Sequence, residues 1–148
     1  MQRKIIPDII EKQTICSLKK SNTIFEAATM MSSANIAAIV IFDDASKVIG
    51  IVTERDLTRR GIAKCLDPKK TAIEEIMTKN PETLSPNDTA NDALELMQIR
   101  HFRHLPVVEE ETCLGVVSIR DLFVAAKTAL EENLRETEAF VFGDRYGA

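Results

Sequence analysis

Two pairs of apolar runs recur along the chain with the same order and nearly the same spacing. Residues 36–42 and 48–53 are rich in β-branched and apolar side chains and are joined by an acidic turn. Residues 104–108 and 114–118 repeat this arrangement. β-branched residues favour strands, and continuous apolar runs such as "IAAIVIF" are typical of strands that are covered on both faces. The pattern predicts two pairs of buried strands.

A predicted helix precedes each strand pair and another follows it. Thr23 and Glu26 have the spacing of a capping box, and apolar residues follow them at helical intervals. Thr89 and Asp92 open the second copy in a similar way. A short extended piece stands before each copy. Each copy is therefore predicted to fold as β-α-β-β-α.

The two copies are related by a nearly constant offset. Ala27 and Ala93 lie 66 positions apart, whereas Asp56 and Asp121 lie 65 apart, so one residue is lost in the turn between the strands. Copies of about 50 residues are too small to bury a good core alone. We therefore predict an α+β (α/β-like) fold, in which the tandem repeats pack on each other about a pseudo-twofold axis.

These elements define three segments. We place the first repeat at residues 10–66, the second with its linker at 67–127, and a C-terminal helix with a frayed tail at 128–148. The C-terminal helix is predicted from an apolar stripe at near-helical spacing. The stripe consists of Ala126, Leu130, Leu134 and Val141. Such a stripe packs against its own domain or against a second copy of the chain.

Composition narrows the class of protein. The chain has 148 residues, is 45% hydrophobic and 28% charged, and carries a formal net charge of −4. These values are ordinary for a globular domain, and the acidic balance argues against general nucleic-acid binding. Its three cysteines lie far apart without a metal-binding or disulfide pattern, and no apolar run is long enough for a membrane span. We expect a soluble, cytoplasmic protein.

A repeated heptad carries the first candidate chemistry. "GIVTERDL" and "GVVSIRDL" place Thr53 three residues before Asp56, and Ser118 three residues before Asp121, where a strand ends and a helix begins. On spacing alone, a helix cap is the favoured interpretation. The same geometry suits a ligand, because a helix N-terminus attracts phosphate and a carboxylate there can accept the hydroxyls of a ribose. The spacing does not separate these two roles.

A second candidate is the basic stretch "IRHFRHLPVV", which brings Arg100, His101, Arg103 and His104 to the start of a buried strand. These residues border either a cleft or a solvated corner. A metal site is the weakest interpretation, because the two histidines are expected on opposite faces of the strand and no acid or cysteine completes a set. The first copy has no basic residue at the matching place. Of two ligand sites, the second is thus expected to be better equipped for phosphate.

These motifs resemble the cystathionine-β-synthase (CBS) domain, which occurs in tandem pairs. "RHLPVV…LGVVSIRDL" is a specific match, "IAAIVIFDDASKVIGIVTERDL" is almost as good, and the resemblance covers roughly residues 14 to 126. It implies two β-α-β-β-α repeats that pack through their sheets. It also implies binding of an adenine nucleotide, or of S-adenosylmethionine, in the clefts between the repeats, and no catalysis in the module.

The resemblance also implies roles for individual residues. Asp56 and Asp121 would hold ribose beside Thr53 and Ser118, with Arg55 beside the first site, while Arg103, His104 and Arg120 would lie near phosphate in the second site. Main chain around Ser17, Ala38 and Ile39, and around Thr83 and Pro106, would line adenine pockets. Val40 replaces the usual proline of the first copy, and Ala37 and Ala38 replace basic groups, so triphosphate binding in the first site is in doubt.

The leading hypothesis is a non-catalytic sensor without a cofactor or a metal site. It would bind AMP, ADP, ATP or S-adenosylmethionine as a regulatory ligand and report to a separate protein effector. The resemblance further implies a homodimer. The alternative is a homodimeric scaffold whose ligand sites are vestigial. An enzyme is the weakest hypothesis, because no nucleophile stands beside a base and no G-x-x-x-x-G-K phosphate loop is present.

Overall fold

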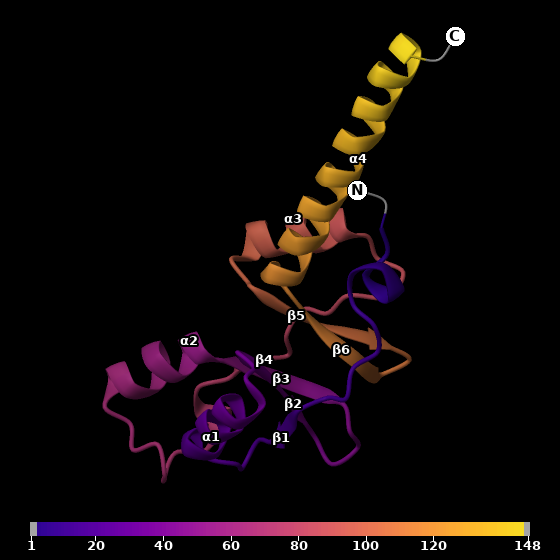
Figure 1. Cartoon of the computed structure of the whole chain (residues 1–148). Coiled ribbons are helices and arrows are strands. Elements are labelled where there is room, and N and C mark those ends of the chain that lie inside the picture. The colour runs from indigo at the N-terminus through magenta and orange to yellow at the C-terminus, as the bar shows by residue number, and fades with distance from the viewer. Residues whose placement is uncertain (1–2, 147–148) are drawn as a thin grey trace.

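Each repeat forms one lobe built around its own small sheet (Figure 1). The computed structural model describes residues 3–146. The sheet of the first lobe has the order β1 (Ser17–Lys19), β2 (Ala38–Phe42), β3 (Val48–Thr53) and β4 (Thr78–Lys79). The sheet of the second lobe consists of β5 (His104–Glu109) and β6 (Thr112–Ser118). Both predicted strand pairs are present and antiparallel.

Helices flank these sheets on their outer sides, which confirms the α+β prediction. In the first lobe they are α1 (Ile24–Ala34) and a helical run made of α2 (Glu54–Asp56), η2 (Leu57–Gly61) and η3 (Ile62–Lys64). In the second lobe they are α3 (Ala90–Arg100) and the first half of α4 (Ile119–Tyr146). Two short turns, η1 (Ile5–Ile9) and η4 (Ile73–Glu75), lie in the segments that lead into the repeats.

All four predicted helix starts are capping boxes. Thr23 Oγ1 accepts a hydrogen bond from Glu26 N–H at 3.1 Å, and the Glu26 carboxylate accepts one from Thr23 N–H at 3.2 Å. The boxes of α3 and of the two helices that follow β3 and β6 have the same reciprocal bonds. A hydroxyl and a carboxylate three residues apart satisfy two orphan donors in each case.

The segments that lead into the repeats cross between the lobes. Ile5 and Ile10 lie in the core of the second lobe, and Gln13 N–H donates to Leu114 O of β6 at 2.9 Å. Reciprocally, Ile73 lies in the core of the first lobe, and β4 extends that lobe's sheet. The segment that leads into each repeat thus packs in the lobe of the other repeat, as a pseudo-twofold relation requires, and these two segments hold the lobes together.

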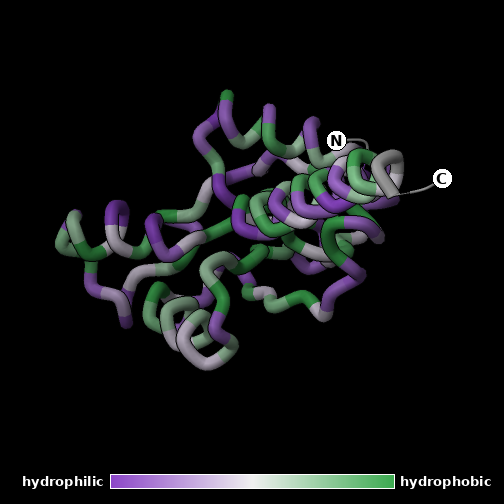
Figure 2. Tube along the Cα trace, turned by 45° about the horizontal axis from the view of Figure 1, so that its top comes forward, coloured by the Kyte–Doolittle hydropathy of each residue, from purple (hydrophilic) through white to green (hydrophobic). Residues whose placement is uncertain are grey.

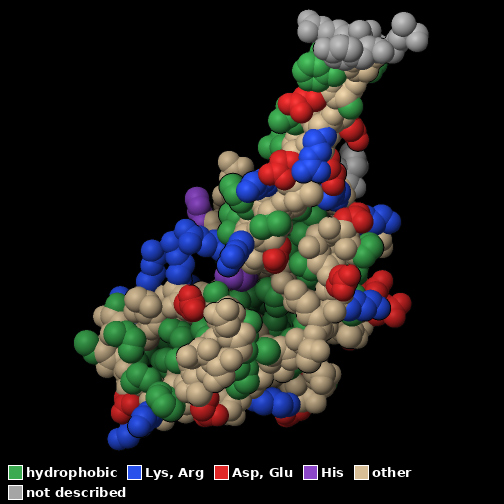
Figure 3. All heavy atoms as spheres, in the orientation of Figure 1, with side chains coloured by type: hydrophobic (Ala, Val, Ile, Leu, Met, Phe, Trp, Pro, Cys, Tyr) green, Lys and Arg blue, Asp and Glu red, His purple; other side chains and the backbone are tan. Residues whose placement is uncertain are grey.

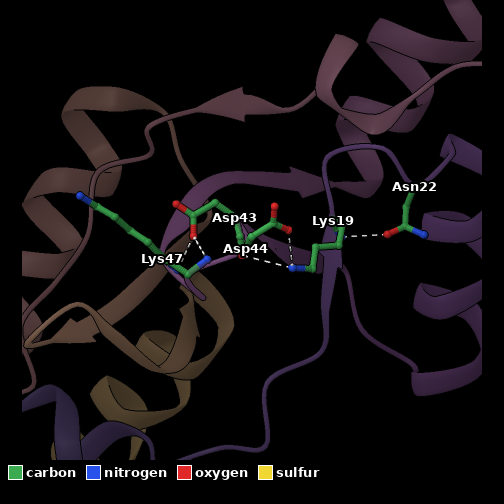
Figure 4. A network of polar contacts seen from close by, with 6 residues as sticks. Lys19, Asn22, Asp43, Asp44 and Lys47 are labelled. Carbon is green, nitrogen blue, oxygen red and sulfur yellow. Dashed lines mark hydrogen bonds and ion pairs between the residues drawn. The ribbon is translucent and has the colours of Figure 1, made fainter.

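The turn between β2 and β3 is closed by its own acidic residues. Asp43 Oδ1 accepts from Ala45 N–H and Lys47 N–H, both at 2.9 Å. Lys19 Nζ of β1 reaches Asp44 Oδ1 at 3.1 Å (Figure 4). These groups are exposed, and such surface pairs contribute little stability. The turn fixes the hairpin, and its Lys47 Nζ also lies 3.6 Å from Glu111 Oε1 in the turn between β5 and β6 of the second lobe.

The long helix α4 projects from the second lobe (Figure 1). Its first turns are held by Leu122 and Ala125, which are buried, while every residue from 130 to 143 is exposed. Around the helix, hydrophobic and hydrophilic positions alternate (Figure 2). The predicted C-terminal helix is thus an uninterrupted continuation of the second repeat's last helix, and the final two residues of the predicted tail lie outside the described range. Among the described residues, no helix has the length and apolar character needed to cross a membrane.

Candidate functional site

Two cavities lie at the junction of the lobes. The Asp56 cavity, of about 370 Å³, has Thr53, Asp56, Arg60 and Glu82 in its wall together with residues 100–105. The Asp121 cavity, of about 620 Å³, has Cys16, Ala38, Ser118 and Asp121 in its wall. Each cavity therefore combines the strand-to-helix junction of one repeat with the strand start of the other.

The first junction holds its carboxylate in a defined orientation. Asp56 Oδ2 accepts from Thr53 N–H at 2.9 Å and from Thr53 Oγ1 at 3.2 Å. Asp56 Oδ1 faces the guanidinium of Arg60, whose Nε lies 3.6 Å away. The Asp56 side chain is only 15% exposed. Its capping bonds occupy Oδ2 and leave Oδ1 directed toward Arg60.

The second junction has the same design. Asp121 Oδ2 accepts from Ser118 N–H at 2.8 Å and from Ser118 Oγ at 2.9 Å. The helix-capping interpretation of both heptads is confirmed, and both caps also line cavities. The two roles that the spacing could not separate are therefore compatible in one geometry.

Two backbone hydrogen bonds bring the strand starts to these helix ends. Glu54 N–H donates to Ala37 O at 3.0 Å, and Ile119 N–H donates to Arg103 O at 2.8 Å. Ala37 and Arg103 are equivalent residues of the two repeats. Arg103 thus stands at the N-terminus of α4, where its side chain lines both cavities.

The Asp56 cavity carries an excess of positive charge. Its arginines are Arg55, Arg59, Arg60, Arg100 and Arg103, and its acids are Glu54, Asp56 and Glu82. Ion pairs join Arg60 to Asp56 and Arg100 to Glu82, the latter at 3.0 Å. Lys and Arg side chains gather beside the hollow between the lobes, with histidine among them (Figure 3).

Mutual repulsion among these arginines affects the pKa of one of them, Arg55. Arg103, and then Arg59, lower the pKa of Arg55 below its ordinary value. Clustered cations that lack enough carboxylates favour an anion between them. The Asp56 cavity is therefore suited to a ligand with several negative charges.

His104 lies between the two cavities and contributes to both walls. Its Nδ1 is buried without a hydrogen-bond partner in the described part of the chain, as is Glu82 Oε2. Burial lowers the pKa of His104, the carboxylates of Asp121 and Glu54 oppose this shift, and Arg103 adds to it. Neutral His104 thus offers an unused polar atom within the junction.

This burial makes a pH dependence predictable. Because the folded pKa of His104 lies below 6.5, the unfolded chain binds the proton first, and the free energy of unfolding falls as pH drops through this region. We expect thermal melts between about pH 7.5 and pH 5.5 to show a smaller loss of stability in His104→Gln than in the wild type. His101→Asn is the control, because His101 is exposed. A wild-type slope retained in His104→Gln would contradict the prediction.

The distribution of basic residues corrects one expectation. The sequence placed the better phosphate site with Asp121, whereas Arg100 and His101 line only the Asp56 cavity and Arg103 and His104 line both. The cause is the pseudo-twofold packing, which sets the strand start of the second repeat against the helix of the first. Arg59 and Arg60 also line the Asp56 cavity. These two arginines could have been predicted from the sequence, because residues three and four positions after Asp56 share its helix face.

The remaining predicted site residues divide into two groups. Thr53 and Arg55 line the Asp56 cavity, and Ala38, Ser118 and Arg120 line the Asp121 cavity. In the described part of the chain, four predicted site residues line neither cavity. They are Ser17, Ile39, Thr83 and Pro106. Ile39 and Pro106 are buried within their strands. The segment just before β1, from Gln13 to Cys16, takes the place that was expected around Ser17.

Comparison with known proteins gives concordant matches. The CBS domain family model matches residues 3–62 and 73–128. Protein YlbB of Bacillus subtilis is 34% identical over 108 residues, covering 72% of either chain. The CBS domain-containing protein CBSCBSPB2 of Arabidopsis thaliana is 30% identical over 123 residues, which are 83% of this chain but 23% of that protein. The crystal structure of the CBS-domain containing protein ATU1752 from Agrobacterium tumefaciens aligns with a TM-score of 0.73 at 30% identity, covering 78% of this chain and 91% of the other.

Proposed function

Because this chain belongs to the CBS domain family, we propose that it is a non-catalytic regulatory module that binds an adenosine-containing ligand at the junction of its repeats. The ligand would be AMP, ADP, ATP or S-adenosylmethionine. Its binding would alter the interaction of the module with a separate protein effector. A ligand that prefers one arrangement of the lobes changes the affinity for the effector by the same factor as the effector changes the affinity for the ligand.

One observation carries this proposal: the same oriented aspartate faces a cavity in both repeats. Asp56 and Asp121 each use one carboxylate oxygen for the helix cap. The other oxygen can accept a ribose hydroxyl, and the adjoining helix N-terminus and arginines suit a phosphate. A purely structural cap requires neither the cavity nor the arginines.

The two cavities should differ in ligand preference. The arginine-rich Asp56 cavity favours the most anionic ligand, ATP, over AMP. S-adenosylmethionine carries a positively charged sulfonium, which the same arginines would repel. The Asp121 cavity has Arg103 and Arg120 as its arginines and offers a larger volume, so AMP or S-adenosylmethionine fits its charge better.

The test is calorimetric titration of the protein with each of the four ligands. We expect Asp56→Asn to weaken ATP binding, and Asp121→Asn to weaken the second site, each by about tenfold to a hundredfold, as for a lost hydrogen bond to a charged group. Asp92→Asn is the matched control, because Asp92 forms the same kind of capping box with Thr89 but lies in neither cavity.

Two outcomes would count against the proposal. Unchanged affinity in both Asp56→Asn and Asp121→Asn would show that the ligand binds elsewhere. A complete absence of binding to all four ligands in the folded wild-type protein would favour the alternative, a scaffold with vestigial sites. Chromatography of the titrated samples should recover the nucleotide unchanged, and its hydrolysis would contradict a non-catalytic role.

A further inference from the structure

Both buried side-chain atoms that lack a hydrogen-bond partner among residues 3–146 belong to the wall of the Asp56 cavity. These atoms are Glu82 Oε2 and His104 Nδ1. An unpaired polar atom destabilises a folded protein, so such atoms are rare in native structures and each requires an explanation. Their occurrence in the same cavity indicates that a bound ligand supplies the missing partners.

The two oxygens of Glu82 are in different situations. Oε1 lies 3.0 Å from Nε of Arg100, and this ion pair holds the side chain at the cavity. Oε2 remains unpaired, and an ionised carboxylate accepts hydrogen bonds but donates none. The side chain as a whole is 36% exposed, so rotation about its last bond can present Oε2 to a ligand. Glu82 therefore requires a ligand group that carries an N–H or O–H donor.

His104 is the less selective of the two unpaired groups. A neutral imidazole nitrogen donates or accepts a hydrogen bond according to its tautomer. His104 also lines both cavities, whereas Glu82 lines only the Asp56 cavity. Selection between ligands in this cavity thus falls to the carboxylate.

The corresponding position of the first repeat has no such acceptor. Leu18 pairs in parallel with β2, and Leu84 pairs in parallel with β5 at the matching place, 66 positions later (84 − 18). Cys16 and Glu82 each stand two residues earlier, so they are equivalent. Cys16 lines the Asp121 cavity, and a thiol is a weak donor and a weak acceptor. Only one of these two equivalent positions thus carries a strong acceptor.

We propose that Glu82 Oε2 accepts a hydrogen bond from the 6-amino group of an adenine base in the Asp56 cavity. This inference rests on the proposed function and adds the residue that selects the base. The phosphates of ATP carry only acceptors, which suit the arginines, and the ribose hydroxyls are expected at Asp56. The 6-amino group is the remaining strong donor of the ligand, and Glu82 Oε2 is the acceptor that lacks a partner.

The surroundings of Glu82 also suit a base. Pro81 precedes Glu82 and lines the same cavity, as do Ile51, Phe102 and Leu105. An apolar wall with a few placed polar groups is the usual composition of a pocket for a planar ligand. The Asp56 cavity therefore combines apolar contacts for the base with one acceptor for its amino group.

This arrangement predicts discrimination against bases that carry an oxygen at position 6. Hypoxanthine and guanine would set that oxygen against the Glu82 carboxylate, so that two acceptors face each other. A base attached to a ribose held by Asp56 cannot shift to present its N1–H instead without losing the ribose contact. A site that is built to bind an N–H group rejects analogues that lack it, because its own polar atom is then left unpaired.

The first test is calorimetric titration of the full chain with ATP and with ITP, which differ only in the base. The Asp121→Asn variant is used so that the Asp56 cavity dominates the signal. We expect ITP to bind about tenfold to a hundredfold more weakly than ATP, as for a lost hydrogen bond to a charged group. GTP should bind as weakly as ITP.

The second test adds Glu82→Gln to this protein. A Gln amide can turn either its oxygen or its amino group to the base, so the ATP and ITP affinities should come within about threefold of each other. Arg100→Gln is the matched control, because it removes the same ion pair but keeps Glu82 Oε2. It should weaken both nucleotides and preserve their ratio. Equal melting temperatures of the variants would show that the fold is kept.

The outcomes separate this inference from the proposed function. Equal affinities for ATP and ITP with Glu82 present, tighter binding of GTP than of ATP, or a ratio unchanged in Glu82→Gln would overturn the role of Glu82 and leave nucleotide binding in place. Absence of binding by every nucleotide would overturn both proposals. The first comparison keeps Glu82 itself, so it tests the inference even if Glu82→Gln does not fold.

Discussion

Replacing Arg103 with glutamate should weaken nucleotide binding in both cavities at once, by about a hundredfold each. No other arginine of this protein lines both cavities in the described structure. The change removes a positive charge and adds a negative one at the N-terminus of α4, where a phosphate would lie. It also places the new carboxylate in the Asp56 cavity, which already contains Glu54 and Glu82.

Two single-cavity variants serve as controls for this result. Arg100→Glu alters only the Asp56 cavity, and Arg120→Glu alters only the Asp121 cavity. Titrations with ATP and AMP, assigned to the cavities by means of Asp56→Asn and Asp121→Asn, give the separate affinities. If Arg103→Glu impaired only one of the two sites, the shared position of Arg103 would have no consequence for binding.

Local rules explain why the elements could be predicted from the sequence. Where a hydroxyl and a carboxylate three positions later directly precede a predicted helix, the pair marks the helix start, and the four pairs identified in this way form capping boxes. The β-branched runs of β2, β3, β5 and β6 are equally explicit. The repeat of the two strand runs at a constant offset also indicated that the two hairpins are equivalent. Both hairpins have a register shift at the equivalent place, after Ile41 and after Val107.

The crossing of the leading segments could not be predicted in this way. Ile5, Ile10 and Ile73 stand in apolar groups too short to show a clear period, so nothing near them in sequence says which lobe they enter. Their destination depends on how two repeats of similar shape close on each other. This destination is a property of the tertiary packing, because the core of each lobe is completed by a segment that leads into the other repeat.

The same packing explains where the predicted site residues lie. Asp56 and Asp121 could be predicted as candidates because a helix cap follows from local spacing, and each lines a cavity. Their partners across each cavity come from the other repeat, so Arg100 and His101 join Asp56 although they lie closer in sequence to Asp121. Ile39 and Pro106 lie outside the lining of both cavities in the described structure, because the middle of a strand covered on both faces is core.

Truncating Ile5 should destabilise the whole protein, although Ile5 lies at the edge of the sequence. Its side chain is 0% exposed within the core of the second lobe, and its N–H donates to Asp88 O at 2.9 Å. Ile5→Ala should cost about 2–5 kcal/mol and lower the melting temperature by about 5–15 °C. Ile62→Ala is the control, since Ile62 is 60% exposed and its loss should cost no more than about 0.5 kcal/mol.

The effect of Ile5→Ala should also reach the ligand site. The segment anchored by Ile5 and Ile10 continues directly to Gln13 and Cys16, which line the Asp121 cavity. Loosening the anchor should therefore weaken binding in the Asp121 cavity more than in the Asp56 cavity, whose wall lacks this segment. Calorimetry well below the melting temperature measures both affinities. Equal losses in the two cavities, or a melting temperature like that of Ile62→Ala, would show that the N-terminal segment is only loosely attached to the second lobe.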